Sequence, residues 1–191
     1  MIHTVLEVLT SELDQFLKPS MKVLPKENVV VLSALMNNAD GAFAVETEGQ
    51  VICSLFNIEQ ERSNLNAPNR SNAVVNPPFN LNLYVLFAAY YKPNRYIEAL
   101  KAISYTIAFF QGKQVFTAAN TPSLPPNIEK VVVEMVNIEM KDISNFWTTL
   151  GAKHLPSIMI KVRMLSITSD LVMEETTPIL GYDTLAAPER K

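Results

Sequence analysis

The stretch SIMIKVRMLSIT, residues 157–168, decides the class of fold. Its apolar side chains alternate with charged ones, so that Ile158, Ile160, Val162 and Met164 share one side and Lys161 and Arg163 the other. Side chains of a strand point alternately to opposite faces of a sheet. The stretch therefore predicts a β-strand with one buried face and one charged face.

The same alternation appears upstream in NLNLYVLFAAYY, residues 80–91. Leu81, Leu83, Val85 and Phe87 share one face there, and the intervening positions begin with Asn80, Asn82 and Tyr84. Apolar or β-branched runs bounded by turn residues predict further strands. These are expected at residues 29–36, 43–45, 51–59 and 128–140.

Three helices are expected between these strands. The first spans residues 4–17, with Thr4 and Glu7 spaced as a capping box and KPS as its stop. The second begins at a capping Asn94 and ends at Gly112. A third runs from about Asp142 to Leu150, before Gly151. The stripe expected to face the core on the second helix is Tyr96, Leu100, Ile103, Ile107 and Phe110.

The order of these elements favours the α+β class over a doubly wound parallel sheet, since the helices are too few and too unevenly placed for regular crossovers. We expect a mixed, mostly antiparallel sheet with about three helices packed on one face. A chain of 191 residues is long enough for one well-packed domain. Residues 1–168 are assigned to this domain, and residues 169–191, with weak periodicity, to a C-terminal arm or tail.

The composition limits the class of partner. A net charge of −3 with no basic cluster argues against a nucleic-acid partner, which would require clustered Lys and Arg. No apolar run is long enough to span a bilayer, and the N-terminus lacks the pattern of a signal peptide. We therefore expect synthesis and assembly in the cytoplasm and no membrane partner. The single cysteine, Cys53, lies in an apolar run and is interpreted as a buried small side chain.

No catalytic motif stands out. The two histidines, His3 and His154, have no cysteine or carboxylate at metal-ligand spacing, and no phosphate-binding or nucleophile-elbow motif is present. A hydrolase built from scattered Ser, His and Asp stays open as an alternative, since such residues meet only in the fold. Trp147 shares an apolar stripe and is assigned to the core. The sequence thus favours a protein that is not an enzyme and has no cofactor or metal.

Two long loops, residues 60–79 and 117–127, carry the features of contact surfaces. The first is rich in Asn and Pro and has too few apolar residues to fold by its own burial, so it suits a partner protein's surface. The candidate interface residues are Glu59, Glu61, Arg62, Arg70, Lys153 and His154. The last two could instead form a solvated loop after the third helix. An alternative is a small-ligand or glycan-binding module that uses loop 60–79 and the pair Tyr90–Tyr91.

Four blocks of the chain resemble a known family in order and spacing: NIEQER (57–62), NPPFNLNLYVLFAAYY (76–91), the run 96–137 and NFWTTLGAKHLPSIMIKVRM (145–164). The most specific parts are FFQG followed by VFT and LPPNIEK, and W..LGAK.LPS followed by KVRM. They are similar to the N-terminal domain family of tail terminator (cap) proteins of extracellular contractile injection systems, which are phage-tail-like particles. The resemblance covers roughly residues 2–167.

The resemblance implies a structural protein with a phage tail-terminator-like fold. It implies a ring, expected to hold six copies, that closes the inner tube and anchors the last sheath layer at the end distal to the baseplate. The implied partners are further copies of the chain, the inner tube protein and the sheath protein. The final location would be the released extracellular or cell-associated particle. Other family members often continue well past this domain.

Overall fold

The structure is a computed structural model that describes residues 2–22, 27–37, 41–61, 79–126 and 128–167. Its described helices and strands follow one another in the order α1 (Ile2–Met21), β1 (Val30–Leu32), β2 (Gln50–Gln60), β3 (Phe79–Tyr90), α2 (Tyr96–Gly112), β4 (Val115–Thr117), β5 (Lys130–Val136), α3 (Ile143–Thr149) and β6 (Ser157–Ile167). Short 3-10 turns at Pro93–Arg95 and Met140–Asp142 precede α2 and α3.

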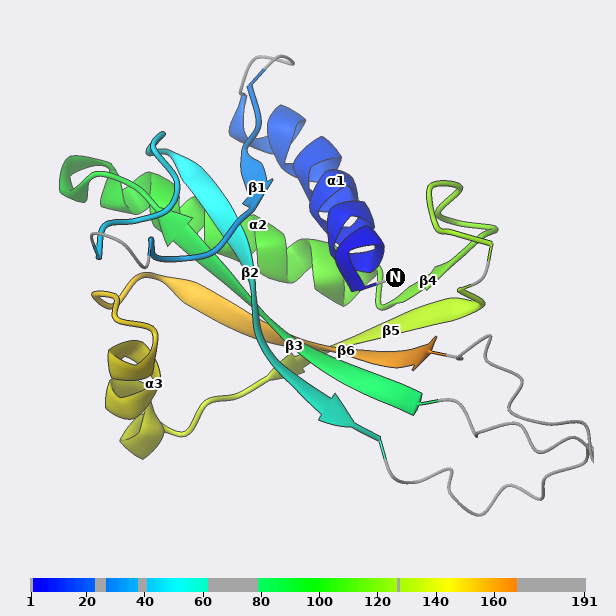
Figure 1. The fold of residues 1–191 in the computed structure, drawn as a ribbon. Helices are drawn as coiled ribbons and strands as arrows, with labels where there is room; N and C mark the ends of the chain where they lie inside the picture. The colour runs from blue at the N-terminus through cyan, green and yellow to red at the C-terminus, as the bar shows by residue number, and fades with distance from the viewer. Residues whose placement is uncertain (1, 23–26, 38–40, 62–78, 127, 168–191) are drawn as a thin grey trace, which may run out of the picture.

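The strands form one sheet in the order β1-β2-β3-β6-β5-β4 (Figure 1). Only β1 pairs in parallel, with β2, and the other described pairs are antiparallel. Register shifts at Leu55/Asn57 in β2 and at Leu81/Leu83 in β3 mark irregularities of the kind that increase local twist. The expected α+β class with a mixed, mostly antiparallel sheet is confirmed.

The helices cover both faces of the sheet, so the expectation that they share one face is wrong. Helices α1 and α2 pack on the side that carries Leu83, Val85 and Phe87, whereas α3 packs on the other side, against Leu86 and Ala88 (Figure 1). The physical reason is that β3 is apolar on both faces near its end, which leaves a second surface to bury. The fold therefore has three layers: α1 and α2 on one face, the sheet in the middle, and the short α3 on the other face.

Helix α1 is longer than its sequence signals indicated. It already includes Thr4 within its first turns and continues past Leu17, with Pro19 inside its last turn. A proline at that place removes a single backbone donor, and the Ser20 hydroxyl still donates to the Phe16 carbonyl. The helix ends at Met21, and Lys22 then takes a positive φ of 55°. The predicted helix start at the Thr4 capping box and the predicted stop at KPS are therefore both wrong.

The core face of α2 also differs from the expected stripe. Its buried residues include Ala99, Ala102, Thr106 and Phe109 together with Ile103 and Phe110. Tyr96, Leu100 and Ile107 are exposed to 55%, 44% and 39%. Because α2 is apolar on several sides, the sequence does not determine which side meets the sheet. The structure turns the two alanines inward. The helix begins after Arg95, so Asn94 lies in the preceding 3-10 turn and is not its cap.

The remaining differences concern short elements. The strand expected at residues 29–36 pairs only over Val30–Leu32, and the one expected at 43–45 reduces to a single bridge between Met36 and Phe43. A three-residue β4 precedes the loop 117–127, where no strand was expected. The strands β2, β3 and β6 and the helix α3 lie where the sequence placed them, whereas β5 covers only Lys130–Val136 of the expected residues 128–140. The assigned arm, 169–191, lies outside the described residues.

Candidate functional site

The clearest polar surface is a strip across four neighbouring strands on the α3 side of the sheet. We define the polar strip as Glu59, Glu61, Asn82, Tyr84, Glu134, Lys161 and Arg163, of which Asn82 is buried beneath the others. The Tyr84 hydroxyl donates to Glu59 Oε2 over 2.8 Å, and Asn82 Nδ2 donates to Glu61 Oε2 over 3.0 Å. These bonds tie the end of β2 to β3.

Ion pairs continue the strip onto β6 and β5. Arg163 lies between two carboxylates, with 2.9 Å from Nη1 to Glu134 Oε1 and 3.7 Å from Nη2 to Glu61 Oε2. Lys161 Nζ lies 5.6 Å from the centre of the Tyr84 ring. Exposed ion pairs add little to folding, with a median of about 0–1 kcal/mol. A row of alternating charge instead supplies specificity when another charged surface docks on it.

The same contacts shift the pKa of Tyr84. Its hydroxyl donates to the Glu59 carboxylate, and that hydrogen bond raises the pKa of Tyr84 above its ordinary value, with a smaller contribution from burial. Lys161 acts in the opposite direction. The protonated Tyr84 hydroxyl is thus the donor that links β3 to Glu59.

The candidate interface residues do not form one site. Glu59 and Glu61 belong to the polar strip, whereas Lys153 and His154 follow α3 and precede β6, at the opposite end of the sheet. Both of the latter are exposed, and the His154 ring lies 5.3 Å from the Trp147 ring. Arg62 and Arg70 lie outside the described residues.

Sequence reasoning named Glu59 and Glu61 but missed five members of the strip as site residues, namely Asn82, Tyr84, Glu134, Lys161 and Arg163. The alternation in residues 157–168 had already placed Lys161 and Arg163 on the outer face. Their partners depend on the register between β5, β6 and β3, since Glu134 stands opposite Lys161 and Lys161 opposite Tyr84. Nothing in the sequence of one strand gives that register.

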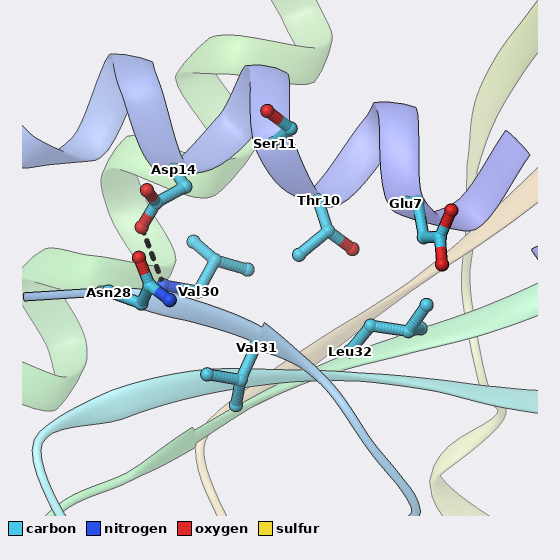
Figure 2. Close-up of a pocket in the computed structure, with 8 residues that line it drawn as sticks. All are labelled: Glu7, Thr10, Ser11, Asp14, Asn28, Val30, Val31 and Leu32. Atoms are coloured by element: carbon cyan, nitrogen blue, oxygen red, sulfur yellow. Dashed lines mark hydrogen bonds between the residues drawn. The ribbon is translucent and has the colours of Figure 1, made fainter. Parts of the chain in front are cut away.

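A second surface lies at the edge of the sheet, between α1 and β1 (Figure 2). Residues of α1 and the chain at β1 line a groove of about 410 Å³, namely Glu7, Thr10, Ser11, Asp14, Asn28, Val30, Val31 and Leu32. Asp14 reaches across and accepts hydrogen bonds from the backbone N–H groups of Val29 and Val30, over 2.7 and 3.0 Å. Past Asp14 the groove is open and Leu32 is 37% exposed. We call this the α1–β1 groove.

The tyrosine pair proposed for glycan stacking is engaged within the protein. The Tyr90 ring lies 4.3 Å from the Phe43 ring, and the Arg95 guanidinium lies 5.5 Å from the centre of the Tyr91 ring. The Asn-rich part of the loop, 62–78, lies outside the described residues. The structure therefore offers no specific support for the glycan-binding alternative.

The described part of the chain shows neither a metal-binding cluster nor an exposed thiol. No group of three or more His, Cys, Asp or Glu side chains is arranged to hold a metal ion there. Cys53 is fully buried, and burial raises its pKa to about 12, which the neighbouring Thr10 hydroxyl opposes only in part. Such a thiol is an inert core side chain at neutral pH, as the sequence suggested.

Within the same described residues, none of the helices has both the length and the apolar character to cross a membrane.

The sequence matches the model of the Pvc16 N-terminal domain family over residues 4–181, so the chain belongs to this family. Comparison with curated protein sequences gives no match. Among solved structures it resembles the sheath/tube terminator, in its extended state, of an extracellular contractile injection system, PVC. The TM-score is 0.65 at 13% identity, over 100% of this chain and 64% of the other.

A second similar structure is the tube-terminating cap of the anti-feeding prophage, with a TM-score of 0.48 and 15% identity. The match covers 92% of this chain and 59% of the cap. The chain thus spans less than two thirds of the length of both relatives. The family and the fold agree with the resemblance seen in the sequence. The first relative is a sheath/tube terminator, in line with the expectation of a non-enzymatic protein.

Proposed function

We propose that this protein is the tail terminator of a contractile injection system. It would form a ring of six copies that closes the inner tube and anchors the last sheath layer at the end distal to the baseplate. The observation that carries the proposal is the likeness of the whole chain to a sheath/tube terminator, joined to the family match over residues 4–181. Assembly would take place in the cytoplasm, before the particle is released.

The polar strip and the α1–β1 groove suit such a ring. Copies related by rotation meet through two different surfaces, one on each neighbour. The groove lies at one edge of the sheet, and the polar strip lies on the α3 face, so one copy can present both to different partners. A backbone edge suits contact with another copy, whereas a row of charges suits a charged layer of tube or sheath.

Electron microscopy of particles that lack the protein tests the function. Without a terminator, tubes are expected to vary widely in length and to carry loosely attached sheaths. Restoring the protein should restore a uniform length and a closed end. Tubes of normal length with firmly held sheaths in the absence of the protein would show that it has another role.

Reversing the charge at Glu59 is expected to reduce capping while sparing the fold. Glu59 is exposed and its side-chain contact is the Tyr84 hydroxyl, so Glu59→Lys should lower the free energy of unfolding by about 1 kcal/mol or less. Like charges brought together at an interface cost several kcal/mol. The variant should therefore associate with tube and sheath about tenfold more weakly, or more weakly still. Sedimentation of the variant with tube and sheath subunits measures this association.

Glu98→Lys is the matched control for that experiment. Glu98 is an exposed acid on α2, on the opposite side of the sheet from the polar strip, and pairs with Arg95. The control makes the same change of charge and should cap tubes normally. If both variants cap equally well, the polar strip is not the contact. If Glu59→Lys also lowers stability by several kcal/mol, its effect is on folding.

A further inference from the structure

A second open edge of the sheet lies opposite β1, where β5 runs past the short β4. Strand β4 pairs with residues 130–132 of β5, and the next backbone N–H, that of Val133, donates to the Gln114 carbonyl over 2.8 Å. Residues two apart in a strand point to the same neighbour. Met135 therefore presents its N–H and carbonyl to the same open side. No described residue pairs with them.

Apolar side chains form walls on both sides of this open edge. A hollow of about 440 Å³ is lined on one side by Tyr96 and Leu100 of α2 and on the other by Ile143 and Trp147 of α3. A second hollow of about 210 Å³ shares Met135 and continues along α2 past Ile107. We call the two together the edge slot.

The edge slot exposes more apolar surface than a strand edge normally leaves open. Met135 is 59% exposed, and Tyr96, Leu100 and Ile107 of α2 are exposed as well. Large apolar patches rarely face water, and open strand edges attract other strands. The slot therefore has the form of a site for an extended peptide, which gains backbone hydrogen bonds from the edge and side-chain contacts from the two walls.

We propose that residues 178–185 of this same chain, PILGYDTL, occupy the edge slot as an added strand. The sequence of this segment fits both walls. In an extended conformation Leu180 and Tyr182 point to one side, and Ile179 and Leu185 to the other. Pro178 has no N–H to donate, which is tolerated at the first position of an edge strand.

The length of the chain also selects this segment. Strand β6 ends at Ile167, at the far end of the sheet from the slot, which lies beside the start of β6. The way back passes about ten residues of strand and two strand spacings, from β6 to β5 and from β5 to the slot, or about 43 Å in all. Pro178 and Leu185 follow Ile167 by 11 and 18 residues. An extended chain of about 3.3 Å per residue spans about 36 Å from Ile167 to Pro178 and about 59 Å to Leu185. The distance back to the slot lies between these two lengths.

The same reach argues for the segment of the same copy and excludes the nearer apolar run. Leu171 and Met173 follow Ile167 by only four and six residues, too few to return to the slot. A tethered segment also has an effective concentration in the millimolar range, far above the concentration of free copies. The inference rests on the slot and the chain length and does not depend on the proposed cap function.

Chemical crosslinking tests the proposal on the full chain. A short bismaleimide is applied to the double variant Met135→Cys/Leu180→Cys, and to the matched pair Leu32→Cys/Leu180→Cys, whose first site is an exposed apolar residue at the opposite edge. Cys53 is buried and should not react. The Met135 pair should give an intramolecular crosslink in most molecules at every protein concentration, at least about tenfold above the Leu32 pair.

A third variant separates docking from random encounter. Adding Leu100→Asp to the Met135 pair changes an exposed wall residue and should lower the crosslinked fraction several-fold without unfolding the protein. Three results would overturn the proposal: equal yields from both pairs, an unchanged yield with Leu100→Asp, or crosslinks that join two copies. Each of these leaves the cap function untouched, since tube length reports on that separately.

Discussion

Replacing Asp14 with alanine is expected to lower the free energy of unfolding by about 3–4 kcal/mol. Asp14 is 8% exposed, and its carboxylate accepts hydrogen bonds from the N–H groups of Val29 and of Val30, the first residue of the edge strand β1. Figure 2 shows the bond to Val30. Alanine leaves both backbone donors unpaired, and each buried unpaired group costs about 1–3 kcal/mol. Urea unfolding followed by circular dichroism measures the loss.

Two related substitutions show whether the acceptor or the charge matters. Asp14→Asn keeps an oxygen that can accept both bonds but loses the ion pair of 2.7 Å to Lys18, so about half of the loss is expected. Lys18→Ala removes the same ion pair from a more exposed side chain and should cost about 1 kcal/mol or less. A loss below about 1 kcal/mol for Asp14→Ala would mean that pairing with β2 alone holds β1.

The position of Asp14 could not be read from the sequence. It lies in the middle of a helix, 15 residues before Val29, and a carboxylate at such a position is normally exposed. Only the packing of α1 beside β1 gives it two backbone donors.

The long strands could be predicted because their pattern repeats every two residues. Residues 80–91 and 157–168 show this period, and Leu83, Val85, Ile160 and Val162 are buried on one face as expected. The period of α2 was misread because an apolar residue stands on nearly every side of it. Ala99 and Ala102 lie on the face of α2 that packs against the sheet, because small side chains let a helix approach a sheet closely.

The candidate site was predictable only in part, for a different reason. Glu59 and Glu61 were found because they end a strand beside a long polar loop. Arg163, which joins Glu61 to Glu134, requires knowledge of which strands are neighbours. Lys153 and His154 follow a helix and share no element with the acids, and their distance from the polar strip comes from the antiparallel course of β6. Contacts between distant parts of the chain cannot be inferred from local pattern.

Replacing Phe87 with alanine is expected to lower the free energy of unfolding by about 4 kcal/mol, at least as much as the loss of the Asp14 carboxylate. Phe87 is fully buried in the central strand β3, opposite Cys53 on one side and Ile158 on the other. Its ring lies 5.2 Å from that of Phe110 in α2. Removing a buried phenyl ring loses its burial and leaves a cavity, typically about 3–5 kcal/mol together. Thermal and urea unfolding measure the effect.

Phe16→Ala provides the comparison, because it removes the same ring from a place that is 40% exposed, beside Phe109 at 5.4 Å. It should cost about 1 kcal/mol. Phe87→Leu, which keeps most of the volume, should cost about 1–1.5 kcal/mol. Since Phe87 touches neither the polar strip nor the α1–β1 groove, folded Phe87→Leu protein should still cap tubes normally. A stable Phe87→Leu protein that no longer caps tubes would contradict the proposed contact surfaces. Capping would then depend on a core residue of β3 that neither surface includes.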